Sequence, residues 1–487
     1  MKQYKFYFLV GAQKLYGDEA LAQVDAHAQA MVQGLNASDA LPGTVVFCPC
    51  IKTAGEATAY MEQANADADC AGVICWMHTF SPSKMWIAGL QALRKPYLHL
   101  NTQFNRGIPW DSIDMDFMNL NQSAHGDREH GYITARLNLP RKIIAGHWQD
   151  ETFRSRIGEW MRCAVGALES RRLRVLRIGD NMRDVAVTEG DKIEAQARLG
   201  WQTDYFATGD ITESIDAVSP AQIAQQMEEY REHYDLDTQN LAAVEYQAKI
   251  QAGLRGFLEQ EGFGAFHTNF QDLHGLRQLP GLAVQDLMRS GCGFAGEGDW
   301  KTAALVRIAK IMAAGRSGGS SFMEDYTYHL APENGLVLGA HMLEVCPSIA
   351  KTRPKIQVHP LGIGGKEPPA RAVFEAKAGQ AVLASLVDMG NRLRLIVNDV
   401  TCVAQPQAMP RLPVAGVLWQ PQPSLTTACE AWILAGGAHH SVLSCDLTAQ
   451  HFEDFAEMTG LEYIHIGQET DISALRRELK YNDMLYK

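Results

Sequence analysis

Four side chains of the metal-binding type lie in the second half of the chain: Glu297, Glu324, His341 and His440. Two carboxylates and two imidazoles form a mixed oxygen and nitrogen donor set, which suits a borderline divalent cation such as Mn²⁺ or Co²⁺. The set contains no thiolate, which argues against a structural zinc site. Two carboxylates beside one cation can differ in pKa, so that one acts as a base and the other as an acid. The residue types therefore predict a metal site that moves protons.

Both carboxylates also have a purely structural interpretation. Glu297 stands between two glycines, just before a segment whose apolar residues recur at helical spacing from position 304 to 311. A carboxylate there can simply complement the positive end of the helix dipole. Glu324 would share one face of a strand with Tyr326 and Tyr328. That face belongs either to a surface hairpin or to a buried strand, where a carboxylate needs a partner or a metal.

The histidines are equally open to a second interpretation. A lone His341 can be a core residue, and a two-residue turn at Asn334-Gly335 would put it roughly 13 Å along the sheet from Glu324. A bulge or a longer connection is therefore needed to bring the two together. His439 and His440 follow the run WILAGGA. We expect only one of them to bind a metal, because neighbouring side chains diverge, and a polar loop is the alternative.

A glycine motif in the same region imitates a cofactor loop. Residues 291–296 match the pattern G-x-G-x-x-G. A dinucleotide-binding loop should leave a strand and be followed by an acidic residue about twenty positions later. Here the preceding segment resembles a helix, and the acidic residues do not have that spacing. We interpret the glycines as a tight turn before a helix, which argues against a nicotinamide-dependent dehydrogenase.

The first third of the chain alternates short apolar runs with helical patterns, which predicts a doubly wound α/β sheet. The expected parallel strands are KFYFLVG (5–11), TVVFCPC (44–50), AGVICWMH (71–78) and PYLHLN (96–101). Ligands of such sheets bind at the carboxyl ends of the strands. The polar residues expected at those ends are Gln13, His78, Asn101 and Gln103.

The alternation of strand and helix patterns begins again after a short charged segment at Glu169–Arg172, which we take as a domain boundary, and it changes after Ser320. The second region has the strand RVLRIGDNM and several amphipathic helices, whereas the third has alternating segments typical of antiparallel strands, with a late helix near 473–480. The glycine-rich stretch 315–321 is either a linker or a buried turn. We predict two Rossmann-like α/β domains and a C-terminal antiparallel β-barrel, over residues 1–168, 169–316 and 317–487.

Composition excludes several functional classes. The 487 residues are 46% hydrophobic and 21% charged, with a formal net charge of −12, which argues against binding nucleic acid because phosphate needs a basic face. No apolar run is long enough to span a bilayer, and the apolar start is too short for a signal peptide. The ten cysteines mostly lie in apolar runs, as expected of reduced core thiols. We predict a cytoplasmic protein.

Motifs along almost the whole length resemble the L-arabinose isomerase family. The matching segments include GAQKLYG (11–17), WMHTFSPSKMW (76–86), PWDSIDMDFMNLNQSAHGDRE (109–129), GFAGEGDWKTAAL (293–305), SFMEDYTYH (321–329), HMLEVCPSIA (341–350), HPLGIGGK (359–366) and EAWILAGGAHHSV (430–442).

The resemblance implies one Mn²⁺ per subunit, replaceable by Co²⁺, and a hexamer whose active sites lie between subunits. The implied metal ligands are Glu297, Glu324, His341 and His440. The implied sugar-binding residues are Gln13, Leu15, Gln122, His125, Met182 and Phe270, with His439 adjacent. The segment from 212 to 257 carries little recognisable motif, and nothing is transferred to it.

The expected reaction is the interconversion of L-arabinose and L-ribulose, with D-galactose and D-tagatose as a second pair. A metal holding O1 and O2 stabilises a cis-enediol intermediate as a Lewis acid. We expect Glu324 to carry the proton between C2 and C1 and Glu297 to serve the hydroxyls; the reverse assignment and a hydride shift are the alternatives. Alternative functions are an L-fucose isomerase-like enzyme acting on another aldose and a non-catalytic sugar-binding protein.

Overall fold

The computed structural model describes residues 4–331, 333–363 and 365–486. These residues form two compact units. The first unit runs to Leu168 and also includes Glu457–Thr459, and the second unit contains the rest of the chain. The central and C-terminal regions thus belong to one compact body, and their division near residue 316 stays a prediction.

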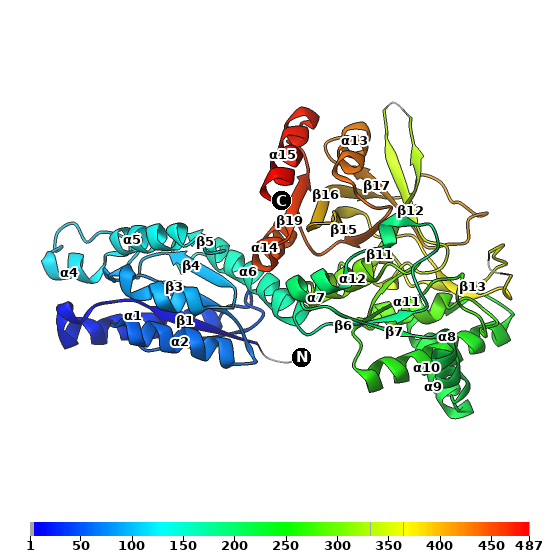
Figure 1. Ribbon diagram of the computed structural model, residues 1–487, viewed down its shortest axis with the longest axis horizontal. Coiled ribbons are helices and arrows are strands. Elements are labelled where there is room, and N and C mark those ends of the chain that lie inside the picture. The colour runs from blue at the N-terminus through cyan, green and yellow to red at the C-terminus, as the bar shows by residue number, and fades with distance from the viewer. Residues whose placement is uncertain (1–3, 332, 364, 487) are drawn as a thin grey trace. The chain divides into compact units, whose positions relative to one another are not determined.

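The first unit is a doubly wound α/β domain, as predicted. Its five parallel strands have the order β2-β1-β3-β4-β5, and Figure 1 shows α1 and α2 along one side of the sheet and α5 along the other. The strands are β1 Lys5–Val10, β2 Thr44–Phe47, β3 Cys70–Trp76, β4 Tyr97–Asn101 and β5 Lys142–Ala145. The helices are α1 Gly17–Asn36, α2 Ala54–Ala66, α3 Ile87–Ala92, α4 Met115–Leu120, α5 Ser123–Arg136 and α6 Glu151–Ser170, which crosses the boundary of the unit.

The strand order reverses between β1 and β3, which is where doubly wound sheets bind ligands. Gln13 follows β1, and His78 follows β3. All seven residues of β3 are buried, as expected of a strand with helices on both faces. The predicted polar residues Gln13 and His78 therefore both lie at the edge of the sheet formed by the carboxyl ends of its strands.

The central part of the second unit is a parallel sheet with the strand order β10-β9-β6-β7. Its strands are β6 Arg174–Ile178, β7 Gln202–Phe206, β9 Ala265–His267 and β10 Gly293–Ala295. Its helices are α7 Lys192–Leu199, α8 Thr208–Asp216, α9 Pro220–His233, α10 Leu241–Glu261, α11 Gly281–Arg289 and α12 Trp300–Met312. The glycine motif lies between α11 and α12 and contains the short strand β10, so the predicted tight turn includes one strand that the sequence did not reveal.

A closed antiparallel barrel of six strands follows, which confirms the predicted fold class. The strand order is β15-β18-β11-β12-β17-β16, and β16 pairs back to β15. The strands are β11 Ser320–His329, β12 Leu336–Ala340, β15 Gly379–Asp388, β16 Leu393–Val403, β17 Gly416–Pro421 and β18 His440–Ser444, while β19 Glu462–Ile466 pairs with β16 in parallel. Buried side chains of Met323, Val337, Val400, Trp419 and Leu443 belong to one hydrophobic cluster.

Two expectations about the third region were incomplete. The segments 355–358 and 370–373 form strands, β13 Lys355–Val358 and β14 Ala370–Val373, but they lie in a separate sheet and not in the barrel: β13 pairs with β14 on one side and with β8 Asp235–Leu236 on the other. The predicted late helix is α15 Ile472–Leu485, and two more helices accompany it, α13 Leu425–Ala435 and α14 Ala449–Thr459. Short 3-10 helices occupy Lys14–Tyr16, Ser83–Trp86, Ala186–Thr188 and Pro347–Ile349.

Helix α12 joins the central sheet to the barrel. It contacts β9 and β10 on one side and β11 and β18 on the other, and ten of its thirteen residues are buried. A helix that is buried around its circumference must pack between two apolar surfaces. Its amino end therefore lies where residues of the sheet and the barrel converge. Among the described helices, none is both long and apolar enough to cross a membrane.

A buried ion-pair network ties β19 to β16 and α15. Arg394 Nε donates to Glu462 Oε2 at 2.8 Å, Arg392 Nε donates to the same oxygen at 2.5 Å, and Asn482 donates to Oε1 at 2.8 Å. Burial alone would raise the pKa of Glu462, but the hydrogen bonds from Arg394, Arg392 and Asn482 outweigh it and lower that pKa.

We expect the variant Glu462→Gln to lose about 3 kcal/mol of stability at pH 7, because it leaves the buried guanidinium group of Arg394 without its anion and leaves Arg392 paired with Asp483 alone. The folded-state pKa of Glu462 lies below its unfolded value. The stabilisation is therefore complete above the unfolded pKa and is lost as the pH falls through the folded pKa. Thermal midpoints of the wild type and the variant should converge as the pH is lowered from 7 toward 3. The exposed Glu469→Gln serves as control; a pH-independent gap between Glu462→Gln and wild type would contradict the assignment.

Candidate metal centre

Glu297 is held in a strained conformation between β10 and α12. Its φ of 59° is in the left-handed region, which is uncommon for a residue other than glycine. The amide of Met182 donates to the Glu297 carbonyl at 2.9 Å, and the amide of Gly298 donates to the carbonyl of Thr268 at 3.0 Å. Strain that is fixed by neighbouring backbone in this way is typical of functional sites. The central sheet thus fixes the position of one predicted ligand.

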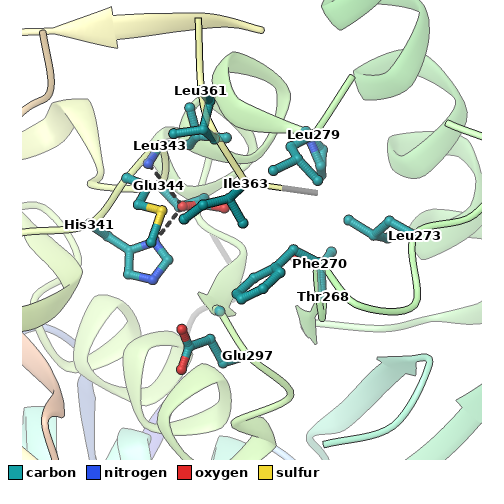
Figure 2. A pocket seen from close by; sticks show the side chains of 13 residues that line it. Thr268, Phe270, Leu273, Leu279, Glu297, His341, Leu343, Glu344, Leu361 and Ile363 are labelled. Carbon is teal, nitrogen blue, oxygen red and sulfur yellow. Dashed lines mark hydrogen bonds and ion pairs between the residues drawn. The ribbon is translucent and has the colours of Figure 1, made fainter. Parts of the chain in front are cut away.

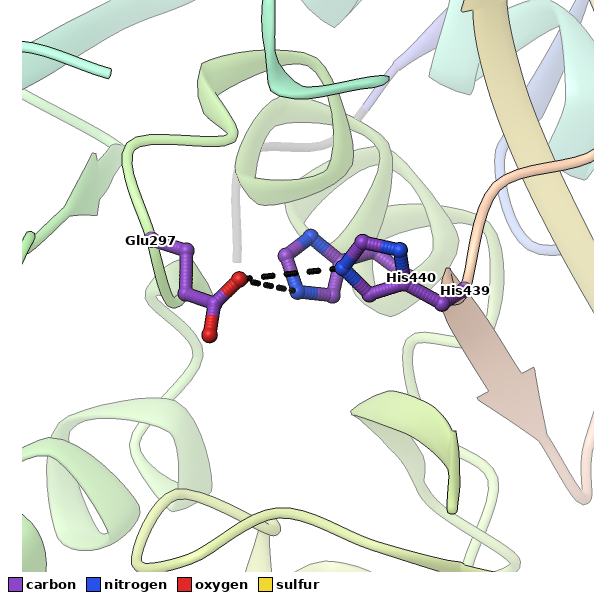
Figure 3. A group of neighbouring side chains, drawn as sticks. All are labelled: Glu297, His439 and His440. Carbon is purple, nitrogen blue, oxygen red and sulfur yellow. Dashed lines mark ion pairs between the residues drawn. The ribbon is translucent and has the colours of Figure 1, made fainter. Parts of the chain in front are cut away.

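Two imidazoles meet the Glu297 carboxylate. Nε2 of His439 and Nε2 of His440 each lie 3.6 Å from Glu297 Oε2, and Figure 3 shows both rings directed toward that oxygen. Potential ligand atoms of the three residues all lie within 4.8 Å of one another. Both histidines therefore approach the carboxylate, and the expectation that only one of them binds a metal stays a prediction. The two rings can reach the same carboxylate oxygen because they lie close together, with their centroids 4.2 Å apart.

Glu324 and His341 are brought together by the register of the β-barrel. Glu324 of β11 lies opposite Ala340 of β12 on one side and opposite His440 of β18 on the other. The register of the β11–β12 pair shifts after Asp325, and the connection is longer than two residues. His341 Nε2 consequently lies 3.8 Å from Glu324 Oε2. The bulge and the longer connection that this arrangement required are both present.

Each buried histidine is oriented by a second carboxylate. His341 Nδ1 is 2.5 Å from Glu344 Oε2, and His440 Nδ1 is 3.2 Å from Asp299 Oδ2. The Nε2 atoms of His341 and His440 are buried and have no hydrogen-bond partner among the described residues. An imidazole with one nitrogen bound to a carboxylate and the other left open is the usual arrangement of a metal ligand. These residues therefore fit a divalent cation, although the set Glu297, Glu324, His341 and His440 stays a prediction.

The electrostatics of the site also favour positive charge. Hydrogen bonding to His439 lowers the pKa of the Glu297 carboxyl and raises the pKa of His439 in return. Burial lowers the pKa of His341, but Glu344 and Glu324 outweigh burial and raise it to about 9. A pocket that stabilises protonated imidazole in this way has an excess of negative charge, which would equally attract a metal cation.

A pocket opens beside these residues. Figure 2 shows the side chains of Glu297 and His341 at one part of the pocket and Phe270 between them and Leu273. Phe270, a predicted sugar-binding residue, lines this pocket. Met182, another one, contacts the site through its backbone bond to Glu297. The second unit thus combines acid–base groups with a pocket.

The other predicted sugar-binding residues gather in the first unit. The Gln122 amide donates to the Tyr16 hydroxyl at 3.0 Å, and Gln122 Oε1 is 3.0 Å from His125 Nδ1. Tyr16 N donates to the carbonyl of Gln13 at 3.3 Å. Leu15, between them in sequence, is 83% exposed. Gln13, Leu15, Gln122 and His125 therefore form one surface of this unit, but their role in binding stays a prediction.

Three residues of the centre were missed by the sequence analysis. Glu344 and Asp299 orient the histidines, and Gly296 provides space, because a Cβ atom there would lie 3.0 Å from His341 Cε1. Asp299 had a detectable signal as the residue before a predicted helix, where it caps α12 by accepting from the Thr302 amide. Glu344 had none, since its spacing from His341 belongs to no regular element.

The fold and the centre define a class of α/β proteins with a barrel-bound cluster of carboxylates and imidazoles. Comparison with known proteins identifies the family. The family models for the N-terminal, central and C-terminal domains of L-arabinose isomerase match residues 1–172, 174–315 and 319–462.

Full-length relatives agree with these models. L-arabinose isomerases of Geobacillus thermodenitrificans and Geobacillus stearothermophilus are each 55% identical over 493 residues, covering 100% of this chain and 99% of the relative. That of a Thermotoga species is 54% identical over 488 residues, covering 100% and 98%. The chain belongs to the L-arabinose isomerase family and is an isomerase.

Proposed function

We propose that this protein is a divalent-metal-dependent aldose–ketose isomerase that interconverts L-arabinose and L-ribulose, with D-galactose and D-tagatose as a second pair. The names of its relatives support the first substrate. The observation that carries metal dependence is the pair of buried Nε2 atoms, on His341 and His440, that have no hydrogen-bond partner among the described residues and lie beside Glu324 and Glu297.

Glu297, Glu324, His341 and His440 would hold Mn²⁺, with Co²⁺ as a substitute, since the donors are oxygen and nitrogen only. When bound, the ion supplies Lewis-acid stabilisation of negative charge on the sugar oxygens. His341 and His440 keep their Nε2 atoms available because Glu344 and Asp299 occupy their Nδ1 atoms. These two carboxylates act through the histidines and are positioning residues.

Glu324 takes the proton from C2 and returns it to C1, so the sugar passes through an enediol. The Glu324 carboxylate accepts no side-chain hydrogen bond from the described residues, and its nearest imidazole nitrogen is 3.8 Å away. Glu297 handles the hydroxyl protons, because its interaction with His439 holds it ionised and gives it a proton donor and acceptor nearby. General acid–base catalysis of this type contributes roughly 10²- to 10⁴-fold in rate.

We further propose a homohexamer in which Gln13, Leu15, Gln122 and His125 of one copy complete the sugar site of another copy. The exposed apolar side chains of the first unit support an interface. Leu15 is 83% exposed, Trp110 is 79% exposed and Met115 is 64% exposed, and apolar residues gathered on a surface commonly mark binding sites. We also propose a cytoplasmic location, because all ten cysteines are free thiols.

The proposal is tested by incubating the purified protein, reconstituted with Mn²⁺, with L-arabinose, D-galactose and L-fucose and measuring the ketose formed. We expect the highest kcat/KM for L-arabinose. Faster conversion of L-fucose would favour the L-fucose isomerase-like alternative, and binding without any ketose would favour a sugar-binding protein. In the same assay, L-arabinose deuterated at C2 should lose label to water, whereas complete retention of the label at C1 would favour a hydride shift over the proton transfer by Glu324.

A further inference from the structure

The pocket beside the candidate metal centre has two chemically different ends. Glu297 and His341 lie at one end, and Figure 2 shows Leu273 and Leu279 on the side away from His341. The full set of apolar lining residues is Phe270, Leu273, Leu279, Pro280, Met342, Leu343, Leu361 and Ile363. Among the described lining residues, Thr268 offers the one hydroxyl side chain.

The chemistry fixes which end of a sugar meets which end of the pocket. C1 and C2 must lie on the side of Glu297 and His341, because Glu324, the proposed base for the proton of these carbons, lies 3.8 Å from His341. The far end of the chain then points toward the leucines. A hydroxyl buried there loses its bonds to water and meets Thr268 as the one side-chain hydroxyl among the described lining residues, whereas a methyl group gains by leaving water.

A second, small apolar cavity adjoins this end of the pocket. It shares Thr268, Leu273 and Pro280 with the first pocket. Its remaining lining residues are Ile178, Thr208, Ile211, Thr212, Ile215, Leu254 and Leu276. Leu273 therefore borders both spaces, so its side chain is less confined than it would be in a close-packed wall.

We propose that the leucine end of this pocket selects a further class of substrate, the 6-deoxyaldoses, which are six-carbon aldoses whose C6 is a methyl group. This inference rests on the proposed isomerase activity and names its preferred six-carbon substrates. The 6-deoxy derivative of D-galactose has the same configuration as D-galactose at C2, C3 and C4, and the two sugars differ only at C6. In the reaction, one hydrogen moves from C2 to C1 and one proton moves from O2 to O1. C1 is reduced and C2 is oxidised, and nothing enters or leaves.

The test compares kcat/KM for D-galactose and 6-deoxy-D-galactose with the Mn²⁺-reconstituted protein. We expect the 6-deoxy sugar to be preferred roughly 10- to 100-fold, the usual range for one group in an apolar pocket. A preference of about fivefold or more supports the proposal, and a smaller or reversed preference overturns it. L-Arabinose in the same assay separates the two claims, because an active enzyme without this preference refutes only the inference, whereas no ketose from any sugar refutes the proposed function.

A pair of variants tests whether the preference for the 6-deoxy sugar comes from the leucine end of the pocket. Leu279 lines the first pocket and is 5% exposed, whereas Leu276 lines only the second cavity and is 6% exposed. Leu279→Asn places an amide beside C6, so we expect the 6-deoxy preference to fall at least fivefold. Leu276→Asn, equally buried but outside the sugar pocket, should keep the wild-type ratio. Thermal midpoints verify that each variant folds. If either fails to fold, the wild-type comparison decides, and an unchanged ratio in folded Leu279→Asn overturns the assignment to this wall.

Discussion

Replacing Glu324 with glutamine is expected to lower kcat for L-arabinose by at least about 10³-fold. The glutamine has the same shape but cannot take a proton from C2, and removal of a general base costs about 10²- to 10⁴-fold. The change also removes one anionic group that faces His341 Nε2 at 3.8 Å. The two losses act on the same step, so the combined effect should lie at the upper end of this range. Steady-state kinetics at saturating Mn²⁺ measure it.

The matched control for this variant is Glu367→Gln. Glu367 has a side chain that is 55% exposed and pairs only loosely with Arg277 at 3.5 Å, and such surface pairs contribute little. Its kcat should stay within twofold of the wild type. A Glu324→Gln enzyme that retains more than one tenth of the wild-type rate would remove Glu324 from the proton path and leave Glu297 as the candidate base. The Glu297→Gln variant would then show the larger loss.

The candidate donor residues could be proposed from the sequence because several of them stand in segments with a local signal. Glu297 is flanked by glycines, and the structure requires a glycine at position 298, where a Cβ atom would lie 2.4 Å from the Asn181 Cα. The tyrosines after Glu324 and the glycines before His439 mark the other two segments. Buried carboxylates and constrained backbone are costly, so sequences that contain them in such settings usually have a functional reason.

The distances between these residues were not predictable, because they depend on long-range register. Glu324 approaches His341 only through the bulge after Asp325, and it approaches His440 only because β18 pairs with β11 from more than a hundred residues away. A shift of one residue in either pairing would turn the side chain to the opposite face. Nothing local in the sequence specifies that register.

The fold was predictable where hydrophobic period and element length agree. The continuous apolar runs of β1, β3 and β4 gave the first sheet. The segments that became β13 and β14 alternate as barrel strands do, but they pair with each other, and β13 also pairs with β8. The hydrophobic period of a segment reveals a half-buried strand, but it does not identify the strand with which that segment pairs. The stretch 315–321, which had a linker composition, is a packed turn in which Asp446 accepts hydrogen bonds from the amides of Gly318 and Gly319.

Complete removal of divalent cations is expected to lower kcat/KM by more than about 10³-fold, and Mn²⁺ should restore it. The physical reason is the acidity of C2–H, which is too weak for a carboxylate base unless the developing charge on the sugar oxygens is stabilised. The residues at the centre favour positive charge, as the raised pKa of His341, about 9, indicates. Activity assays before and after exhaustive chelation, and again with added Mn²⁺ or Co²⁺, measure the effect.

Thermal unfolding provides a readout that does not depend on turnover. An ion present at a hundred times its Kd stabilises the folded state by about 2.7 kcal/mol, which corresponds to a rise of several degrees in Tm. We expect this rise in the wild type and its loss in His440→Asn, because His440 is buried and presents Nε2 to Glu297. His465→Asn is the matched control, since His465 has a side chain that is 42% exposed and pairs with Asp399 outside the centre. A chelated enzyme that works at full speed, or a His440→Asn enzyme that keeps the Mn²⁺-dependent rise, would contradict a metal site at these residues.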